Sequence, residues 1–131
     1  MIASLGDIVE QHAENFPDKP AVIQEGVTWT YKELRELSRR AAQGLLDAGV
    51  GEQDRVAFLD RSSREYFPFL FGAGMVNAVT GAVNWRLAAP EMEYILNNAG
   101  AKVLLIGEEF LGHLAQMNLP STTTVIVLGD P

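Results

Sequence analysis

The fold class is decided by residues 79–107, VTGAVNWRLAAPEMEYILNNAGAKVLLIG, which form the pattern strand, helix, strand. The runs Val79–Val83 and Lys102–Gly107 have the length and apolar content of strands. Between them Pro90 starts a helical segment that Gly100 ends, which are the positions that these two residue types favour. Strands that alternate with helices at this spacing predict a parallel sheet covered by helices.

The same alternation continues on both sides of that stretch. Four further strands are predicted at Ala21–Gln24, Val27–Thr30, Arg55–Asp60 and Thr123–Leu128, the first two forming a hairpin around Glu25-Gly26. Further helices are predicted from Ser4 to before Pro17, from Thr30 to Gly49, over Ser63–Ala78 and over Glu108–Met117. We therefore expect an α/β fold, a mostly parallel, helix-covered sheet with a small N-terminal hairpin, in a single domain or fragment over residues 1–131.

Two S/T-x-x-E capping boxes are predicted, Thr30 with Glu33 and Ser62 with Glu65, and Ser4 is a further N-cap. In the helix after Thr30, the inward positions are Leu34, Leu37, Ala41, Leu45 and Ala48. In the helix after Pro90, they are Met92, Ile95, Leu96 and Ala99. The arginines of the longer helix alternate with carboxylates, which favours a solvated face over an anion-binding patch.

Composition and charge limit the function. The chain has 10 Lys and Arg against 17 Asp and Glu, a net charge of -7, which disfavours nucleic acid as a partner. It has no cysteine, and its two histidines lack the spacing of metal ligands, so we assign no metal site. The N-terminus does not resemble a secretory signal, so a cytoplasmic protein is expected. The apolar segment 67–83 contains proline and glycines, and we interpret it as a buried helix and a buried strand, not a transmembrane segment.

Motifs of known chemistry are missing from the sequence. Gly72-Ala73-Gly74 resembles a dinucleotide loop, but it lies within an apolar helix, so close helix packing explains it better. A G-K-[ST] phosphate loop and a G-x-S-x-G nucleophile are both absent. Residue patterns alone therefore indicate an α/β domain without a defined activity.

The order of segments resembles the N-terminal portion of the acyl-CoA synthetases, which belong to the adenylate-forming superfamily. The segments are FPDKPAVIQEG, WTYKELRELSRRAAQGLLDAGV, DRVAFLDRSSREYF, GAVNWRLAAPEMEYILNNAGAKVLLIG and TTTVIVLGD, and together they cover almost the whole chain. The run Asn84-Trp85-Arg86-Leu87 before a Pro-Glu helix start is the most diagnostic of them. The chain is thus expected to be part of a larger adenylate-forming N-terminal domain.

This resemblance implies an enzyme that activates a fatty or aryl carboxylic acid with ATP and Mg²⁺ and then transfers the acyl group to coenzyme A (CoA). The family's phosphate loop, magnesium segment, ribose-binding aspartate and catalytic lysine do not occur in these 131 residues. The resemblance therefore places no catalytic residue here. The chain alone is expected to be inactive and to bind none of ATP, Mg²⁺ and CoA tightly.

Arg86 is the one site residue that the resemblance suggests, since the matching arginine in related CoA ligases approaches the 3′-phosphate of CoA. A guanidinium is permanently charged and matches phosphate oxygens in shape. The alternative is that Arg86 pairs with Glu91, Glu93 or another carboxylate. The helix start beside it is poorly suited to a phosphate, because Pro90 has no N–H and Glu91 is negatively charged.

A second hypothesis is a truncated, non-enzymatic homologue that binds a partner or self-associates. A piece of a larger domain exposes an apolar face, and such faces drive association. Self-association of the 131-residue chain is expected under either hypothesis.

Overall fold

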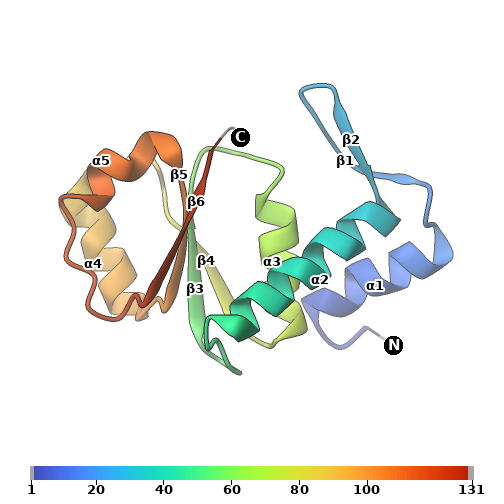
Figure 1. The fold of residues 1–131 in the computed structure, drawn as a ribbon, viewed down its shortest axis with the longest axis horizontal. Helices are drawn as coiled ribbons and strands as arrows, with labels where there is room; N and C mark the ends of the chain where they lie inside the picture. The colour runs from blue at the N-terminus through green and yellow to red at the C-terminus, as the bar shows by residue number, and fades with distance from the viewer. Residues whose placement is uncertain (1, 130–131) are drawn as a thin grey trace. The chain divides into compact units, whose positions relative to one another are not determined.

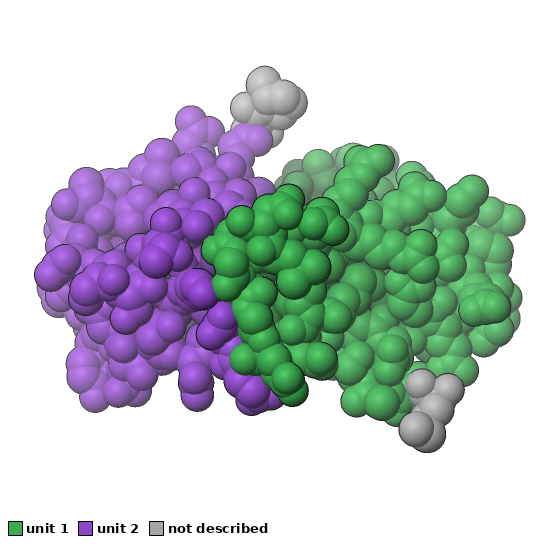
Figure 2. Space-filling model, turned by 60° about the horizontal axis from the view of Figure 1, so that its bottom comes forward, with its two compact units in different colours: residues 1–52, 62–78 green, residues 53–61, 79–131 purple. Residues whose placement is uncertain are grey.

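The computed structural model describes residues 2–129. Two compact units emerge from the internal contacts, and Figure 2 colours them separately. Unit 1 contains residues up to 52 together with 62–78, and unit 2 contains 53–61 together with residues from 79 onward.

Unit 1 is three helices and a hairpin. Its elements are α1 (Leu5–Asn15), β1 (Pro20–Gln24), β2 (Val27–Thr30), α2 (Tyr31–Asp47) and α3 (Tyr66–Met75). The strands β1 and β2 pair antiparallel, which confirms the predicted hairpin. Its turn residues Glu25 and Gly26 have φ angles of 49° and 78°, as a tight two-residue hairpin turn requires.

The helix α2 begins with the predicted capping box. The Glu33 amide donates to Thr30 Oγ1 at 3.2 Å, and the Thr30 amide donates to Glu33 Oε1 at 3.1 Å. Its buried positions are Leu34, Ser38, Ala42 and Leu45. The predicted Leu37, Ala41 and Ala48 are only half-buried, so the inward face is rotated from the expected one. Ser38 is tolerated in the interior because its hydroxyl donates to the Leu34 carbonyl at 2.7 Å.

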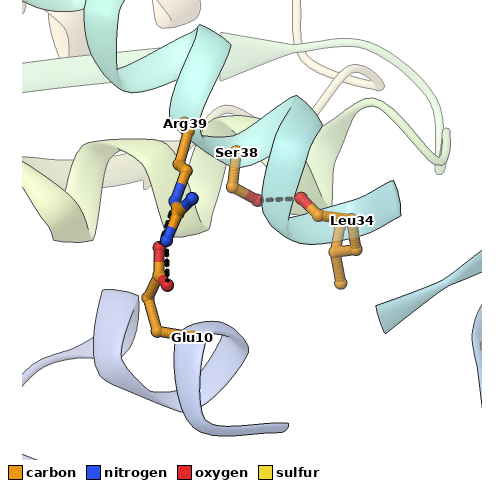
Figure 3. A network of polar contacts seen from close by, with 4 residues as sticks. All are labelled: Glu10, Leu34, Ser38 and Arg39. Carbon is orange, nitrogen blue, oxygen red and sulfur yellow. Dashed lines mark hydrogen bonds and ion pairs between the residues drawn. The ribbon is translucent and has the colours of Figure 1, made fainter. Parts of the chain in front are cut away.

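The outer face of α2 is solvated, as predicted, and one of its arginines connects it to α1. Figure 3 shows Arg39 facing Glu10 through both carboxylate oxygens, with Nε–Oε1 at 2.7 Å and Nη2–Oε2 at 2.6 Å. This hydrogen-bonded carboxylate raises the pKa of the Arg39 guanidinium. The Arg39 and Glu10 side chains are 57% and 34% exposed, so this ion pair between the two helices adds little stability.

The predicted capping box at Ser62 does not form, and α3 starts at Tyr66. Gln24 of the hairpin is hydrogen-bonded to the loop that precedes α3. Its Nε2 donates to the Ser62 carbonyl at 2.9 Å, and its Oε1 accepts from the Arg64 amide at 2.8 Å. Because these backbone groups are bonded to Gln24, the segment stays outside the helix.

Glycines on α3 allow close packing, which confirms the structural interpretation of Gly72-Ala73-Gly74. A Cβ on Gly72 would lie 2.8 Å from the carbonyl oxygen of Ser38 and 2.9 Å from the amide nitrogen of Ala42, both on α2. A Cβ on Gly74 would lie 2.9 Å from the amide nitrogen of Gly6 on α1. The small residues thus bring three helix backbones together.

Unit 2 contains a four-stranded sheet in the order β4-β3-β5-β6. Its elements are β3 (Arg55–Leu59), β4 (Val79–Ala82), α4 (Ala89–Ala99), β5 (Val103–Gly107), η1 (Glu108–Phe110), α5 (Leu111–Leu114) and β6 (Thr124–Leu128). All three strand pairs are parallel, which confirms the predicted fold class. Figure 1 shows α4 and α5 on the same face of the sheet.

The core of unit 2 lies between that face and α4. It consists of Ala57, Leu59, Val83, Met92, Leu96, Ala101, Leu104, Ile106 and Phe110. Two predicted inward positions of α4 are wrong, because Ile95 is 40% exposed and Ala99 is also exposed. The core-facing stripe of this helix is narrower than the hydrophobic pattern suggests.

Two further sequence predictions need correction. The strand β4 is mostly exposed instead of buried, because it lies at an edge of the sheet. The helix predicted over 108–117 is reduced to a 3₁₀ turn and four helical residues, and Gly112 in its middle weakens it. Among the described residues, none of the helices is both long and apolar enough to span a membrane.

Candidate functional site

The candidate site lies where the strands of the unit 2 sheet end. The chain leaves β3 at Asp60 and Arg61, β4 at residues 83–87 and β5 at Glu108 and Glu109. The strand order doubles back at β3, with β4 on one side of it and β5 on the other. In open parallel sheets, ligands bind outside the carboxyl ends of the strands near such a reversal.

Trp85 is the fixed centre of this site. It is partly buried against the core, and its ring centroid lies 6.2 Å from that of Phe110 at an interplanar angle of 46°. Phe110 is itself 5% exposed, so the indole packs against a buried ring. The face of a tryptophan ring attracts cations, and two arginine guanidinium groups lie over the ring of Trp85.

Arg86 is the first of these arginines. Its Cζ lies 4.4 Å from the Trp85 ring centroid, and its backbone amide donates to Asn84 Oδ1 at 3.0 Å. Within the part of the chain that the structure describes, no carboxylate lies within ion-pairing distance of its guanidinium. The alternative pairing with Glu91 or Glu93 is therefore absent, and Glu93 instead accepts a hydrogen bond from the Asn118 amide.

Arg61 is the second arginine at the ring. Its Cζ also lies 4.4 Å from the Trp85 centroid, and its Nε donates to Glu109 Oε1 at 2.8 Å. The charge of the Arg61 guanidinium is therefore neutralised by a carboxylate, whereas the Arg86 guanidinium contacts the Trp85 ring and forms no ion pair with a described residue. Sequence reasoning missed Arg61 and Glu109 as site residues, because 48 positions separate them. Their only signal is that each follows a strand.

Two more carboxylates, those of Asp60 and Glu108, follow strands at the same edge. Asp60 Oδ1 accepts from the Arg61 amide at 2.8 Å, and its carboxyl group occupies the place that a Cβ on Gly107 would take. Glu108 occupies the corresponding place at Gly129. Within residues 2–129, no three metal-ligating side chains lie close enough to hold a metal ion.

The start of α4 adds no anion site to this edge. The helix begins at Ala89, one residue before the predicted start, and its N-cap Ala88 offers no side-chain hydrogen bond. Pro90 removes one of the free amides, and Glu91 lies in the first turn. Among residues 2–129, Arg86 is thus an exposed cation beside this terminus without a carboxylate partner.

Comparisons with known proteins place this chain in a family. The pattern of the family described as AMP-binding enzyme matches residues 9–131. The fatty acid–acyl-carrier-protein ligase ScoC of Streptomyces coeruleorubidus is 40% identical over 119 residues, which are 91% of this chain and 23% of ScoC. The long-chain-fatty-acid–CoA ligase FadD13 of Mycobacterium tuberculosis is 35% identical over 106 residues, 79% of this chain and 21% of FadD13. The chain spans about a fifth of the length of these relatives.

Solved structures agree with the sequence matches. The inhibitor-bound crystal structure of the N-terminal domain of FACL13 from Mycobacterium tuberculosis has a TM-score of 0.92 at 29% identity. The match covers 97% of this chain and 34% of that one. The resemblance seen in the segment order is therefore confirmed. The chain belongs to the AMP-binding enzyme family, and it corresponds to an N-terminal portion of the family's fatty acid and acyl-CoA ligases.

Proposed function

We propose that this chain is the N-terminal part of an ATP-dependent acyl-CoA synthetase. The complete enzyme activates a fatty or aryl carboxylic acid as an acyl adenylate and then forms a thioester with CoA. The family match over residues 9–131 carries this proposal, and the ligase names of the relatives support it. The described residues offer no cluster of metal ligands, so we assign no residue of this chain to Mg²⁺.

We propose that Arg86 binds the 3′-phosphate of CoA. It is exposed, it has no carboxylate partner in the described part of the chain, its guanidinium lies over the Trp85 ring, and its backbone amide donates to Asn84. A guanidinium held in this way loses little side-chain entropy when a phosphate accepts its hydrogen bonds. The residues therefore fit a single phosphate group at this edge.

Replacing Arg86 with alanine is expected to weaken CoA binding by the complete ligase about tenfold, the lower range for a charge-assisted hydrogen bond. Dephospho-CoA lacks the 3′-phosphate, so its affinity should hardly change. The measurement is the dissociation constant of each compound by titration calorimetry, together with the KM of thioester formation. Arg40→Ala removes the same charge from an exposed position of α2 and serves as the control. Equal losses for both compounds, or no loss, would show that Arg86 does not contact this phosphate.

An acyl carrier protein is a second candidate acceptor of the acyl group, because ScoC, at 40% identity, is named as a ligase of acyl carrier protein. A carrier protein presents the same pantetheine thiol but has no 3′-phosphate. If the natural acceptor is a carrier protein, acyl transfer to it should exceed transfer to CoA, and Arg86→Ala should leave the carrier reaction unchanged. Acyl transfer to CoA that exceeds transfer to a holo-carrier protein would support the synthetase.

We also propose that the isolated 131-residue chain self-associates through the edge strand β6. Val125, Ile126 and Val127 are 40%, 37% and 49% exposed, and one side of the strand has no partner among the described residues. An apolar, unpaired edge recruits another strand. Light scattering should give a mass above that of one chain, and Ile126→Lys should restore the monomer mass. A monomer at millimolar concentration of the unmodified chain would contradict this proposal.

A further inference from the structure

Unit 2 contains a pocket between the edge strand β4 and the C-terminal half of α4. Its volume is about 150 Å³. The residues that line it include Arg55, Ala57, Val79, Gly81, Ile95 and Ala99. Because Val79 and Ile95 are 44% and 40% exposed, the pocket can be reached from solvent.

Small residues create this pocket. Successive residues of a strand face opposite sides of the sheet, so Gly81 lies on the same face as the core residue Val83. The strand register places Gly81 beside Ala57, and neither residue fills the space toward α4. A Cβ added to Gly81 would meet no atom within 4 Å. The gap is thus a consequence of the sequence at this point of the sheet.

The pocket has the size of a single aromatic ring. An apolar cavity of about 150 Å³ is large enough to bind benzene. A ring in the pocket would also cover part of Val79 and Ile95, which removes apolar surface from water. The apolar part of a fitting ligand is therefore one ring.

Arg55 adds a positive charge to this apolar lining. It is the first residue of β3, and the alternation along the strand directs its side chain to the same face as Ala57. It is exposed, and within residues 2–129 its guanidinium forms no ion pair. A guanidinium can donate two parallel hydrogen bonds to one carboxylate. An aromatic ring that carries a carboxylate matches both features.

We propose that this pocket binds a small aromatic carboxylate, with the ring against Gly81 and Ile95 and the carboxylate at Arg55. The inference goes beyond the proposed function, because neither Arg86 nor CoA takes part in it. Its test measures binding instead of turnover, so either proposal can fail while the other stands.

The test is a titration of the 131-residue protein with sodium benzoate at constant ionic strength, followed by nitrogen-15 NMR of the backbone amides. Saturable shifts are expected at Gly81, Ile95 and Ala99, with a dissociation constant of about 1 mM, which is typical of so small a ligand. Arg55→Ala should weaken benzoate binding about fivefold, the upper range for an exposed ion pair, and leave the uncharged benzamide unaffected. Arg40→Ala removes the same charge from an exposed position of α2 and should change neither affinity.

A second set of variants fills the pocket. Gly81→Leu should abolish benzoate binding and keep the fold, because its first added carbon has open space. Gly44→Leu makes the same change at an open position of α2 and is the matched control. Ala99→Leu fills the pocket from α4 and should act as Gly81→Leu does, which keeps the test available if one variant does not fold.

Several results would overturn the inference. These are shifts that do not saturate, shifts that persist in the filled variants, and an Arg55→Ala variant that binds benzoate as tightly as the unmodified protein. Equal losses for benzoate and benzamide in Arg55→Ala would also overturn it, because the carboxylate would then not be recognised. Shifts at the same amides that follow protein concentration without benzoate would mean that a second copy occupies the groove, which excludes the proposed ligand.

Discussion

Replacing Gly72 with valine is expected to lower the free energy of unfolding by about 3 kcal/mol, the upper range for overpacking of a tight interior. The first added carbon alone would lie 2.8 Å from the Ser38 carbonyl oxygen and 2.9 Å from the Ala42 amide nitrogen. Both are backbone atoms of α2, so they cannot swing aside as a flexible side chain would. The helices α2 and α3 must separate, which weakens the packing of Ser38 and Ala42 as well.

The measurement is urea unfolding of the purified protein followed by far-ultraviolet circular dichroism. Gly44→Val makes the same change inside α2, where a Cβ meets nothing within 4 Å, and should stay within about 0.5 kcal/mol of the unmodified protein. Gly72→Ala adds one carbon instead of three and should give a smaller loss, which keeps the test available if the valine variant does not fold. Equal midpoints for Gly72→Val and Gly44→Val would show that the close crossing is wrong.

The sequence predicted the elements well wherever a local rule determines them. The pair Thr30 and Glu33 forms its box because both partners belong to one turn of helix, and the turn at Glu25-Gly26 has the expected conformation for the same reason. The S-x-x-E sequence at Ser62 matches the same motif, but the capping box does not form. Gln24, 38 residues earlier in the chain, is instead hydrogen-bonded to the Ser62 carbonyl in the loop before α3. Local patterns do not reveal such distant competitors.

The candidate site shows the same limit. Arg86 could be singled out because it lies in a recognisable segment directly after a strand. Its lack of a carboxylate partner depends on where Glu93 points, and Glu93 faces the Asn118 amide. Arg61 was missed altogether, because strands that are separate in sequence become neighbours only in the folded sheet.

Replacing Leu96 with alanine is expected to cost about 3 kcal/mol of unfolding free energy, while Ile95→Ala should cost less than about 1 kcal/mol. Leucine and isoleucine contain the same atoms, and these two residues are adjacent on α4. Leu96 is 1% exposed within the core of unit 2, whereas Ile95 is 40% exposed. Alanine also favours a helix more than isoleucine does, which offsets part of the smaller loss.

This pair tests the orientation of α4, the point on which the hydrophobic pattern misled. The hydrophobic pattern of Met92, Ile95, Leu96 and Ala99 predicts that all four side chains face the core. Both substitutions would then lower the free energy of unfolding by about the same amount. Of these four residues, the structure buries only Met92 and Leu96, so α4 faces the sheet through a narrower line of contact. Urea unfolding of the two variants decides between these orientations. A loss at Ile95 as large as the loss at Leu96 would mean that the helix is rotated toward the stripe that the sequence predicts.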